Sequence, residues 1–188
     1  MIKWRNQETV FEPKPLSNFL ARLSDSAAAR LQAHLAQAPL VTVADAARAQ
    51  VMQHLAASSD ERGGLLIGEV FARDGALAAV DIALVRVVLA VASVEYSSSG
   101  VALRMESGVW EQARPALAEG RIVVGWYHSH PGLGAFFSDT DRRTQRAFFT
   151  HPYSLGWVVD PLQGEEKWFL GAEALELAPV RVLTDEWA

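Results

Sequence analysis

Short apolar runs alternate with amphipathic stretches along the chain, and this pattern predicts the secondary structure. Strands are predicted where Val, Leu and Ile gather in short runs, at residues 40–43, 65–71, 78–91, 121–130, 155–159, 167–170 and 175–183. Helices are predicted where apolar residues recur at helical spacing, at residues 24–37, 45–57, 106–119 and 139–149. Pro115 is expected to break the third helix, and residues 13–15 are predicted to be irregular. Because strands and helices interleave, the predicted fold class is α/β, with one mixed sheet and helices on both faces.

Two histidines close the central predicted strand, and a serine and an aspartate follow at a fixed spacing. The pattern is His-x-His, seven residues, Ser, two residues, Asp, and it is formed by His128, His130, Ser138 and Asp141. Residues i and i+2 of a strand point to the same face, so both imidazoles are expected to reach one metal ion. With Asp141 as a third ligand, one coordination position is left for water, which is typical of catalytic rather than structural zinc sites.

A plainer interpretation of part of this pattern is a helix N-terminus. Ser138 fits an N-cap, and Asp141 is the acidic residue three positions later that completes a capping box. Such boxes are common, and a single histidine on a strand is more often structural than a ligand. The combination is much more specific than either part. The cap and the metal site are also compatible, because a helix N-terminus would hold Ser138 and Asp141 rigidly.

Three stretches extend the pattern beyond these positions. Residues 123–132 read VVGWYHSHPG, residues 61–68 read ERGGLLIG, and residues 157–161 read WVVDP. Together with the histidine pattern they resemble the JAMM (MPN+) zinc metalloprotease family of deubiquitinases, over about residues 40–180. The resemblance implies a three-layer αβα JAMM/MPN fold similar to that of cytidine deaminases, in a compact, prokaryotic form. We therefore expect an N-terminal extension at residues 1–38 and the metalloprotease domain at residues 39–188.

The resemblance also implies a role for each motif residue. One zinc ion per chain would be held by His128, His130 and Asp141, and Ser138 would donate a hydrogen bond to the oxyanion. Glu61 would carry the proton rather than bind the metal, although a glutamate after a helix is usually solvated. The implied reaction is zinc-dependent hydrolysis of the bond after the C-terminal tail of ubiquitin or a ubiquitin-like protein, as in bacterial ubiquitin-like conjugation systems. A conjugation-pathway or activating partner is expected with it.

The tail of such a substrate is flexible and extended, so we expect an edge segment to pair with its backbone. The resemblance places a family insertion at residues 93–105, where apolar residues can pair as a strand and residues 97–100 allow movement. The loop at residues 132–137 is expected to close the other side. The predicted tail-binding side chains are Val94, Tyr96, Val101, Leu103 and Phe136.

Composition excludes several other classes. The chain has 188 residues, enough for one domain with a sizeable core, and a net charge of −5, which argues against a nucleic-acid surface. It has no cysteine, which excludes disulfides, thiolate metal ligands and a thiol nucleophile. A zinc deaminase is excluded too, because that chemistry needs a Pro-Cys-x-x-Cys motif. No apolar run is long enough to span a membrane, and we expect a cytoplasmic protein.

Two other functions stay open at this level. An interaction scaffold would be similar to the family's metal-free members, which usually lack motif residues that this chain keeps. A processing protease for a sulfur-carrier protein would use the same chemistry on a different substrate. Three other polar residues are interpreted as ordinary: Ser129 as structural on the opposite face, His54 as a surface or boundary residue, and His151 as structural.

Overall fold

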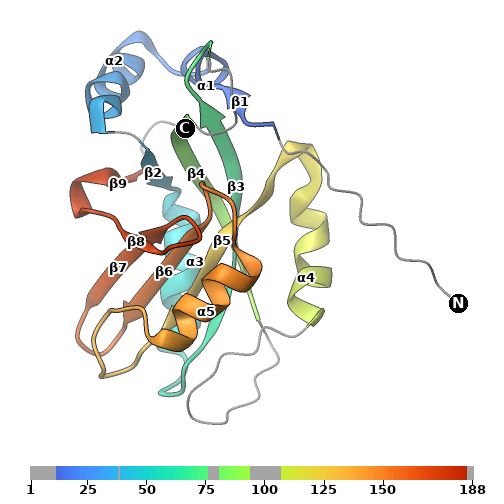
Figure 1. The fold of residues 1–188 in the computed structure, drawn as a ribbon, viewed down its shortest axis with the longest axis vertical. Coiled ribbons are helices and arrows are strands. Elements are labelled where there is room, and N and C mark those ends of the chain that lie inside the picture. Colours follow the sequence, from blue (N-terminus) through green and yellow to red (C-terminus); the bar gives the residue numbers. More distant parts are fainter. Residues whose placement is uncertain (1–11, 38, 76–80, 94–106, 186–188) are drawn as a thin grey trace, which may run out of the picture.

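One mixed β-sheet runs through the computed structural model, which describes residues 12–37, 39–75, 81–93 and 107–185 (Figure 1). In these residues the strand order is β8-β7-β6-β5-β3-β4-β2-β9, with β1 paired to β3. The strands are β1 (Lys14–Pro15), β2 (Leu40–Val43), β3 (Gly63–Ala72), β4 (Ile82–Ala92), β5 (Ile122–Ser129), β6 (Leu155–Asp160), β7 (Glu165–Leu170), β8 (Leu175–Glu176) and β9 (Val182–Thr184). The chain therefore places β3, β5 and β6 side by side in the middle of the sheet.

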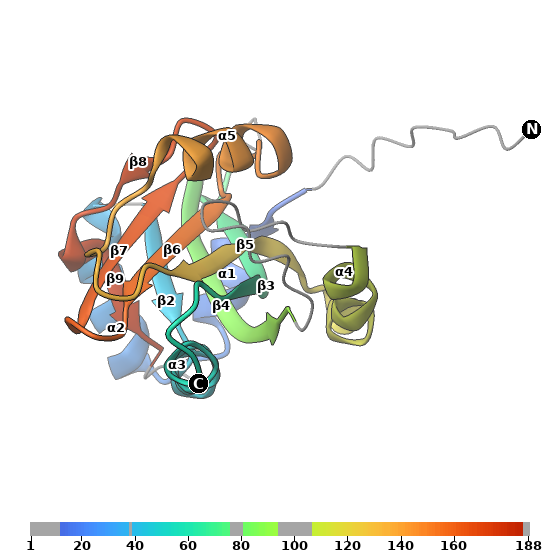
Figure 2. The ribbon, with the colours of Figure 1, turned by 90° about the horizontal axis from the view of Figure 1, so that it is seen from below.

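Helices cover both faces of this sheet. The α-helices are α1 (Leu16–Leu20), α2 (Asp25–His34), α3 (Asp45–Ala56), α4 (Ser107–Ala113) and α5 (Asp139–Phe148), and the 3₁₀ helices are η1 (Leu35–Gln37), η2 (Arg114–Gly120) and η3 (Pro179–Arg181). Helix α3 lies on one face, and α4 and α5 lie on the other (Figure 2). This arrangement confirms the predicted α/β class. None of the helices in the described ranges has the length and apolarity needed to cross a membrane.

Each face has its own apolar core. Val51 and Leu55 of α3 pack with one set of strand side chains, among them Leu66. Val109 of α4 packs with the alternate set, which includes Leu65. Leu65 and Leu66 are neighbours in β3 and point to opposite faces, as the two-residue period of a strand requires. The continuous apolar runs predicted as strands therefore reflect burial on both faces.

The pairing of β3 and β6 with β5 decides which strand ends lie together. β3 runs antiparallel to β5, with Gly63 opposite His128, and β6 runs parallel to β5, with Val158 opposite the same histidine. The start of β3 and the ends of β5 and β6 consequently lie together at one edge of the sheet. Glu61 precedes β3 by two residues, so this topology carries it to the histidines.

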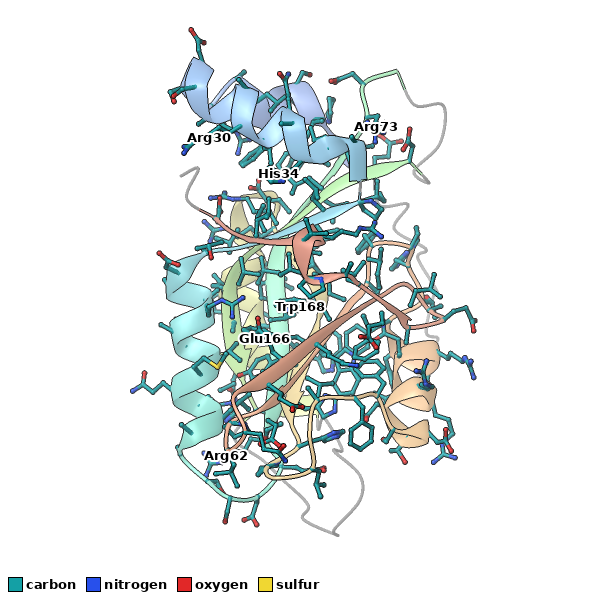
Figure 3. The ribbon with its side chains drawn as sticks, turned by 90° about the vertical axis from the view of Figure 1, so that its left-hand side faces the viewer. Arg30, His34, Arg62, Arg73, Glu166 and Trp168 are labelled. Carbon is teal, nitrogen blue, oxygen red and sulfur yellow. The ribbon has the colours of Figure 1, made fainter. Side chains whose placement is uncertain are left out.

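Helix α3 is fastened to β6 and β7 by a charged and aromatic contact. The Arg48 guanidinium is 2.8 Å from the Glu166 carboxylate and lies over the Trp157 ring at 5.2 Å. Trp157 stacks on Trp168 with ring centroids 4.4 Å apart, and Figure 3 shows Glu166 and Trp168 on the same strand. Both charged side chains are partly buried, so the contact fixes the helix against the sheet.

Residues 12–37 contact β3 at the end of the strand that lies far from the histidines. Lys14 is 2.7 Å from the buried Glu69 carboxylate, and Arg86 reaches Glu69 at 3.4 Å and Asp185 at 2.6 Å. Phe19 lies under the Arg86 guanidinium at 5.3 Å. The division into an extension and a domain at residue 38 stays a prediction.

Two parts of the predicted secondary structure are wrong. The single strand at residues 175–183 is two short strands, β8 and β9, separated by η3, because Pro179 begins that 3₁₀ helix and cannot donate to a ladder. Residues 14 and 15, predicted to be irregular, form β1, and α1 follows directly. The break at Pro115 is confirmed, since α4 ends at Ala113 and η2 follows.

Candidate metal centre

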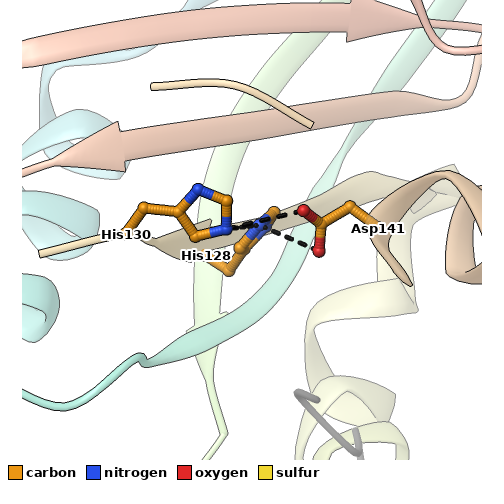
Figure 4. A group of neighbouring side chains, drawn as sticks. All are labelled: His128, His130 and Asp141. Carbon is orange, nitrogen blue, oxygen red and sulfur yellow. Dashed lines mark hydrogen bonds and ion pairs between the residues drawn. The ribbon is translucent and has the colours of Figure 1, made fainter. Parts of the chain in front are cut away.

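Three side chains converge at the edge where β5 ends (Figure 4). The Nε2 atoms of His128 and His130 are 3.2 Å apart. Asp141 Oδ1 is 3.2 Å from His128 Nε2, and Asp141 Oδ2 is 3.5 Å from His130 Nε2. All three residues are buried. The structure thus brings together the three residues that the spacing predicted as ligands.

A capping box places the aspartate. Ser138 is the N-cap of α5: its hydroxyl oxygen accepts the Asp141 N–H at 3.2 Å, and the Ser138 N–H donates to Asp141 Oδ2 at 2.7 Å. The Ser138 hydroxyl also donates to the same carboxylate oxygen at 2.6 Å. The helix cap and the convergence of ligands therefore occur together, because the cap turns the Asp141 carboxylate toward the strand end.

A tryptophan and a glutamine behind the site hold His128. The Trp126 ring stacks on the His128 imidazole at 4.5 Å with an angle of 8° between the planes. Trp126 Nε1 donates to Gln145 Oε1 at 2.6 Å, and Gln145 is itself 0% exposed. Phe137 packs 5.9 Å from His128 in the space that Gly156 leaves, where a Cβ would collide with the phenyl ring. Sequence reasoning missed Gln145 because nothing in the local pattern pairs it with Trp126.

The electrostatics of the cluster favour an ionised carboxylate. Burial alone raises the pKa of Asp141, but hydrogen bonds with His128 and His130 and the hydrogen bond from Ser138 outweigh burial and hold that pKa well below its ordinary range. Within the described residues, the Nδ1 atoms of both histidines are buried without a hydrogen-bond partner. The converging polar atoms of the site are the two Nε2 atoms and the Asp141 carboxylate oxygens.

The donor set fits one divalent metal ion. Zinc binds imidazole nitrogen at about 2.0–2.1 Å in tetrahedral geometry, which puts neighbouring ligand atoms about 3.3 Å apart. The His128 to His130 distance of 3.2 Å and the Asp141 distances of 3.2 and 3.5 Å are close to this separation. Two imidazoles with one carboxylate are ligands that zinc accepts.

Two further predicted residues lie beside the ligands. Glu61 Oε1 is 3.9 Å from His130 Nε2, and the glutamate side chain is 34% exposed. The Phe136 ring lies 4.8 Å from the His130 ring and is 44% exposed. The other predicted tail-binding residues, Val94, Tyr96, Val101 and Leu103, lie outside the described residues.

One buried carboxylate anchors the loop that follows the histidines. Asp160 accepts backbone N–H groups from Gly132 at 2.9 Å and Gly134 at 2.7 Å, and two more from Leu162 and Gln163 in the β6–β7 turn. Its exposed fraction is 0%. The loop with Phe136 is consequently fixed rather than free to swing, a role for Asp160 that its position in a strand pattern did not indicate.

We expect the Asp160 contribution to stability to depend on pH. Burial raises the pKa of Asp160, but the backbone hydrogen bonds led by Gly132 and Gly134 lower it to about 2. An unfolded aspartate titrates near 3.9, so the stabilisation is complete above about pH 4 and is lost as pH falls toward about 2. Asp160→Asn should therefore melt below the wild-type temperature near neutral pH, and the difference should narrow in acid. Thermal melts followed by circular dichroism across this pH range test the prediction, with Asp60→Asn as the control. A difference in melting temperature between Asp160→Asn and wild type that does not change with pH would contradict it.

The interpretation of His54 as a surface or boundary residue agrees with its intermediate exposure. His54 Nδ1 lies 2.9 Å from the Tyr127 hydroxyl, and the two rings meet edge to face at 5.9 Å. Burial, and then the charge of Arg62, lower the pKa of His54. His54 is therefore a half-buried boundary residue of α3 that contacts β5. His151 is exposed and stacks on Tyr153 at 4.9 Å, away from the cluster.

Comparison with known families finds a family match over most of the chain. A profile of the family described as prokaryotic homologs of the JAB domain matches residues 43–170. The chain therefore belongs to this family, and the resemblance to JAMM/MPN proteins is confirmed. In the solved structures, protein DSY2949 from Desulfitobacterium hafniense has a TM-score of 0.55 and 21% identity, over 77% of this chain and 92% of its own. That likeness shows the fold.

Several curated proteins match part of the chain. The 26S proteasome regulatory subunit rpn11 of Schizosaccharomyces pombe is 36% identical over 105 residues, which cover 53% of this chain and 31% of that protein. The ubiquitin carboxyl-terminal hydrolase RPN11 of Saccharomyces cerevisiae is 34% identical over 105 residues, with the same two coverages of 53% and 31%. COP9 signalosome complex subunit 5 of Eremothecium gossypii is 37% identical over 90 residues, covering 46% and 21%. The chain thus spans less than a third of each of these relatives.

Proposed function

We propose that this protein is a zinc-dependent isopeptidase or peptidase that hydrolyses the bond after the C-terminal tail of ubiquitin or a ubiquitin-like protein. The observation that carries the proposal is the convergence of two imidazoles and a carboxylate, with the Glu61 carboxylate 3.9 Å from His130. A scaffold has no need of that arrangement. The relatives named for the proteasome and for ubiquitin hydrolysis support the substrate class.

His128, His130 and Asp141 would hold one zinc ion per chain. When bound, the ion supplies a Lewis acid that activates water and polarises a carbonyl. The histidines must be neutral to bind it, and Asp141 must be ionised, which agrees with the direction of its pKa. The buried aromatic support behind His128 keeps this ligand in one orientation, which reduces the cost of assembling the site on binding.

Glu61 would move the proton in this reaction. Its carboxylate is beside the ligands but is partly exposed, so it has access to water and to substrate. It would accept a proton from the attacking water and deliver it to the leaving amine, a role that glutamate can fill when held within reach of both. The distance to His130 indicates a neighbour of the ligand set rather than a member of it.

Ser138 would stabilise the negative charge that develops on the carbonyl oxygen. In the structure its hydroxyl donates to Asp141 at 2.6 Å. A hydroxyl hydrogen rotates freely, so the same oxygen can donate to a substrate once metal binding engages the carboxylate. Loss of one such donor typically costs about 2.7–4 kcal/mol of transition-state stabilisation.

The substrate tail would lie beside His130. Phe136 offers a half-exposed aromatic wall there, fixed by the Asp160 anchor of its loop. Pairing of the tail with residues 93–105, through Val94, Tyr96, Val101 and Leu103, stays a prediction. A cytoplasmic location and a conjugation-pathway or activating partner are part of the same proposal, as is the absence of a nucleic-acid or membrane partner.

Cleavage of defined fusions tests the proposal. Purified protein loaded with zinc is incubated with ubiquitin, with a bacterial ubiquitin-like protein and with a sulfur-carrier protein, each extended beyond its terminal Gly-Gly. We expect mass spectrometry to show cleavage directly after the tail of at least one fusion, abolished by a chelator and restored by zinc. A thiol-alkylating reagent should have no effect, because the chain has no cysteine. The same assay is run on isopeptide conjugates of these proteins. The proposal would be refuted if the zinc-loaded protein left every fusion and every conjugate intact.

A further inference from the structure

Two hydrogen bonds fasten the backbone of Arg62 to Ser129, and Glu61 is the next residue along the chain. The Ser129 N–H donates to the Arg62 carbonyl oxygen at 2.8 Å, and the Arg62 N–H donates to the Ser129 hydroxyl oxygen at 3.0 Å. Arg62 lies where the connection from α3 enters β3 (Figure 3). The segment that carries Glu61 is thus tied to the strand that carries the ligands.

At this point the hydroxyl replaces a backbone acceptor. Gly63 pairs with His128 in the antiparallel β3–β5 ladder, so Arg62 and Ser129 would form the next pair. Residues in a hydrogen-bonded antiparallel pair exchange two backbone bonds. Here the Ser129 N–H makes one of them, while the Arg62 N–H reaches the side-chain oxygen. The ladder therefore continues by one residue through the serine side chain.

Burial makes this contact a firm anchor for a partly exposed group. Ser129 is 0% exposed. Residues 57–62 have no helix or strand, and the Glu61 side chain at their end is 34% exposed. A carboxylate on such a connection samples many positions unless its backbone is fixed next to it. Fixing the Arg62 backbone restricts that freedom.

We propose that Ser129 is a positioning residue, whose hydroxyl keeps the Glu61 carboxylate beside His130 by fixing the Arg62 backbone. The inference rests on the proposed function, in which Glu61 carries the proton. It gives a specific task to a side chain that points away from the metal ligands. Its effect reaches the reaction only through Glu61.

Substitutions at Ser129 distinguish the effect of the hydroxyl group from the effect of side-chain shape. Threonine keeps the hydroxyl, whereas valine has the shape of threonine without it. Loss of one hydrogen bond should lower kcat about 2- to 10-fold in Ser129→Ala and Ser129→Val, with KM little changed, and Ser129→Thr should keep most of the activity. Equal activity of the threonine and valine variants would overturn the proposal.

A double-mutant cycle shows whether the effect passes through Glu61. In a Glu61→Gln background, Ser129→Ala should lower the residual rate no further, because no proton carrier is left to position. Zinc affinity, measured by competition with a chelator, should be the same in Ser129→Ala and wild type. Additive losses or weaker zinc binding would mean that Ser129 supports the ligand strand instead, which overturns the proposal.

Amide hydrogen exchange tests the anchor without any activity. Exchange at Arg62 should be faster in Ser129→Ala and Ser129→Val than in wild type and Ser129→Thr. Unchanged exchange in all four proteins would overturn the anchor itself. If exchange changes as expected but the wild type cleaves no substrate, the anchor stands and the proposed function fails. Faster exchange with undiminished kcat would overturn the positioning role alone.

Discussion

Replacing His128 and His130 together by alanine should abolish metal binding and all metal-dependent activity. The Nε2 atoms of the two imidazoles lie 3.2 Å apart and supply two of the three donors, so their loss leaves only the Asp141 carboxylate. Elemental analysis should show about one zinc per chain in the wild type and almost none in the variant. The folded content measured by circular dichroism should persist, because Trp126 and Gln145 still fill the core behind the site.

Thermal stability gives a second measure of the same loss. A ligand that binds only the folded state stabilises it by about 2.7 kcal/mol at a concentration of 100 times its Kd. Zinc should therefore raise the melting temperature of the wild type and leave that of the double variant unchanged. His151→Ala is the matched control, because this exposed histidine stacks on Tyr153 away from the cluster. Equal zinc content in all three proteins would place the metal elsewhere.

The sequence predicts those elements whose own residues decide them. Helix α3 and strand β2 have the predicted positions to within a residue, because their apolar spacing and their burial agree. The short element β1 did not follow from its residues, since only its pairing with the end of β3 makes it a strand. The break at Pro179 had a local signal, a proline within an apparent strand, which the apolar residues on either side outweighed.

The candidate site likewise contains residues that the sequence predicts and residues that it does not. His128, His130 and Asp141 could be found because a strand period and a helix cap fix their directions locally. Their supports come from other parts of the chain: Asp160 collects N–H groups from two loops, and Gln145 reaches Trp126 from α5. Such pairings depend on how elements pack, and single-sequence patterns contain no record of them. The motif residues could therefore be predicted from the sequence, whereas Asp160 and Gln145, which support them from other parts of the chain, could not.

Glu61→Gln should leave the metal centre intact and remove most of the activity. Glutamine has nearly the same size and shape as glutamate, but its amide cannot accept and return a proton at neutral pH. General acid–base catalysis by one side chain typically contributes about 10²- to 10⁴-fold to a rate, so kcat should fall by this amount. Since Glu61 Oε1 is 3.9 Å from His130 and outside the group of three convergent ligands, zinc content should not change.

The pattern of kinetic constants should identify the role. An interaction made only in the transition state lowers kcat and kcat/KM together, with little change in KM. Glu173→Gln is the matched control, because it makes the same chemical change at an exposed residue paired with Arg146 on the surface. Wild-type turnover in Glu61→Gln would show that another group carries the proton. Loss of zinc from this variant would instead make Glu61 a ligand, and the division between metal binding by three residues and proton transfer by a fourth would be wrong.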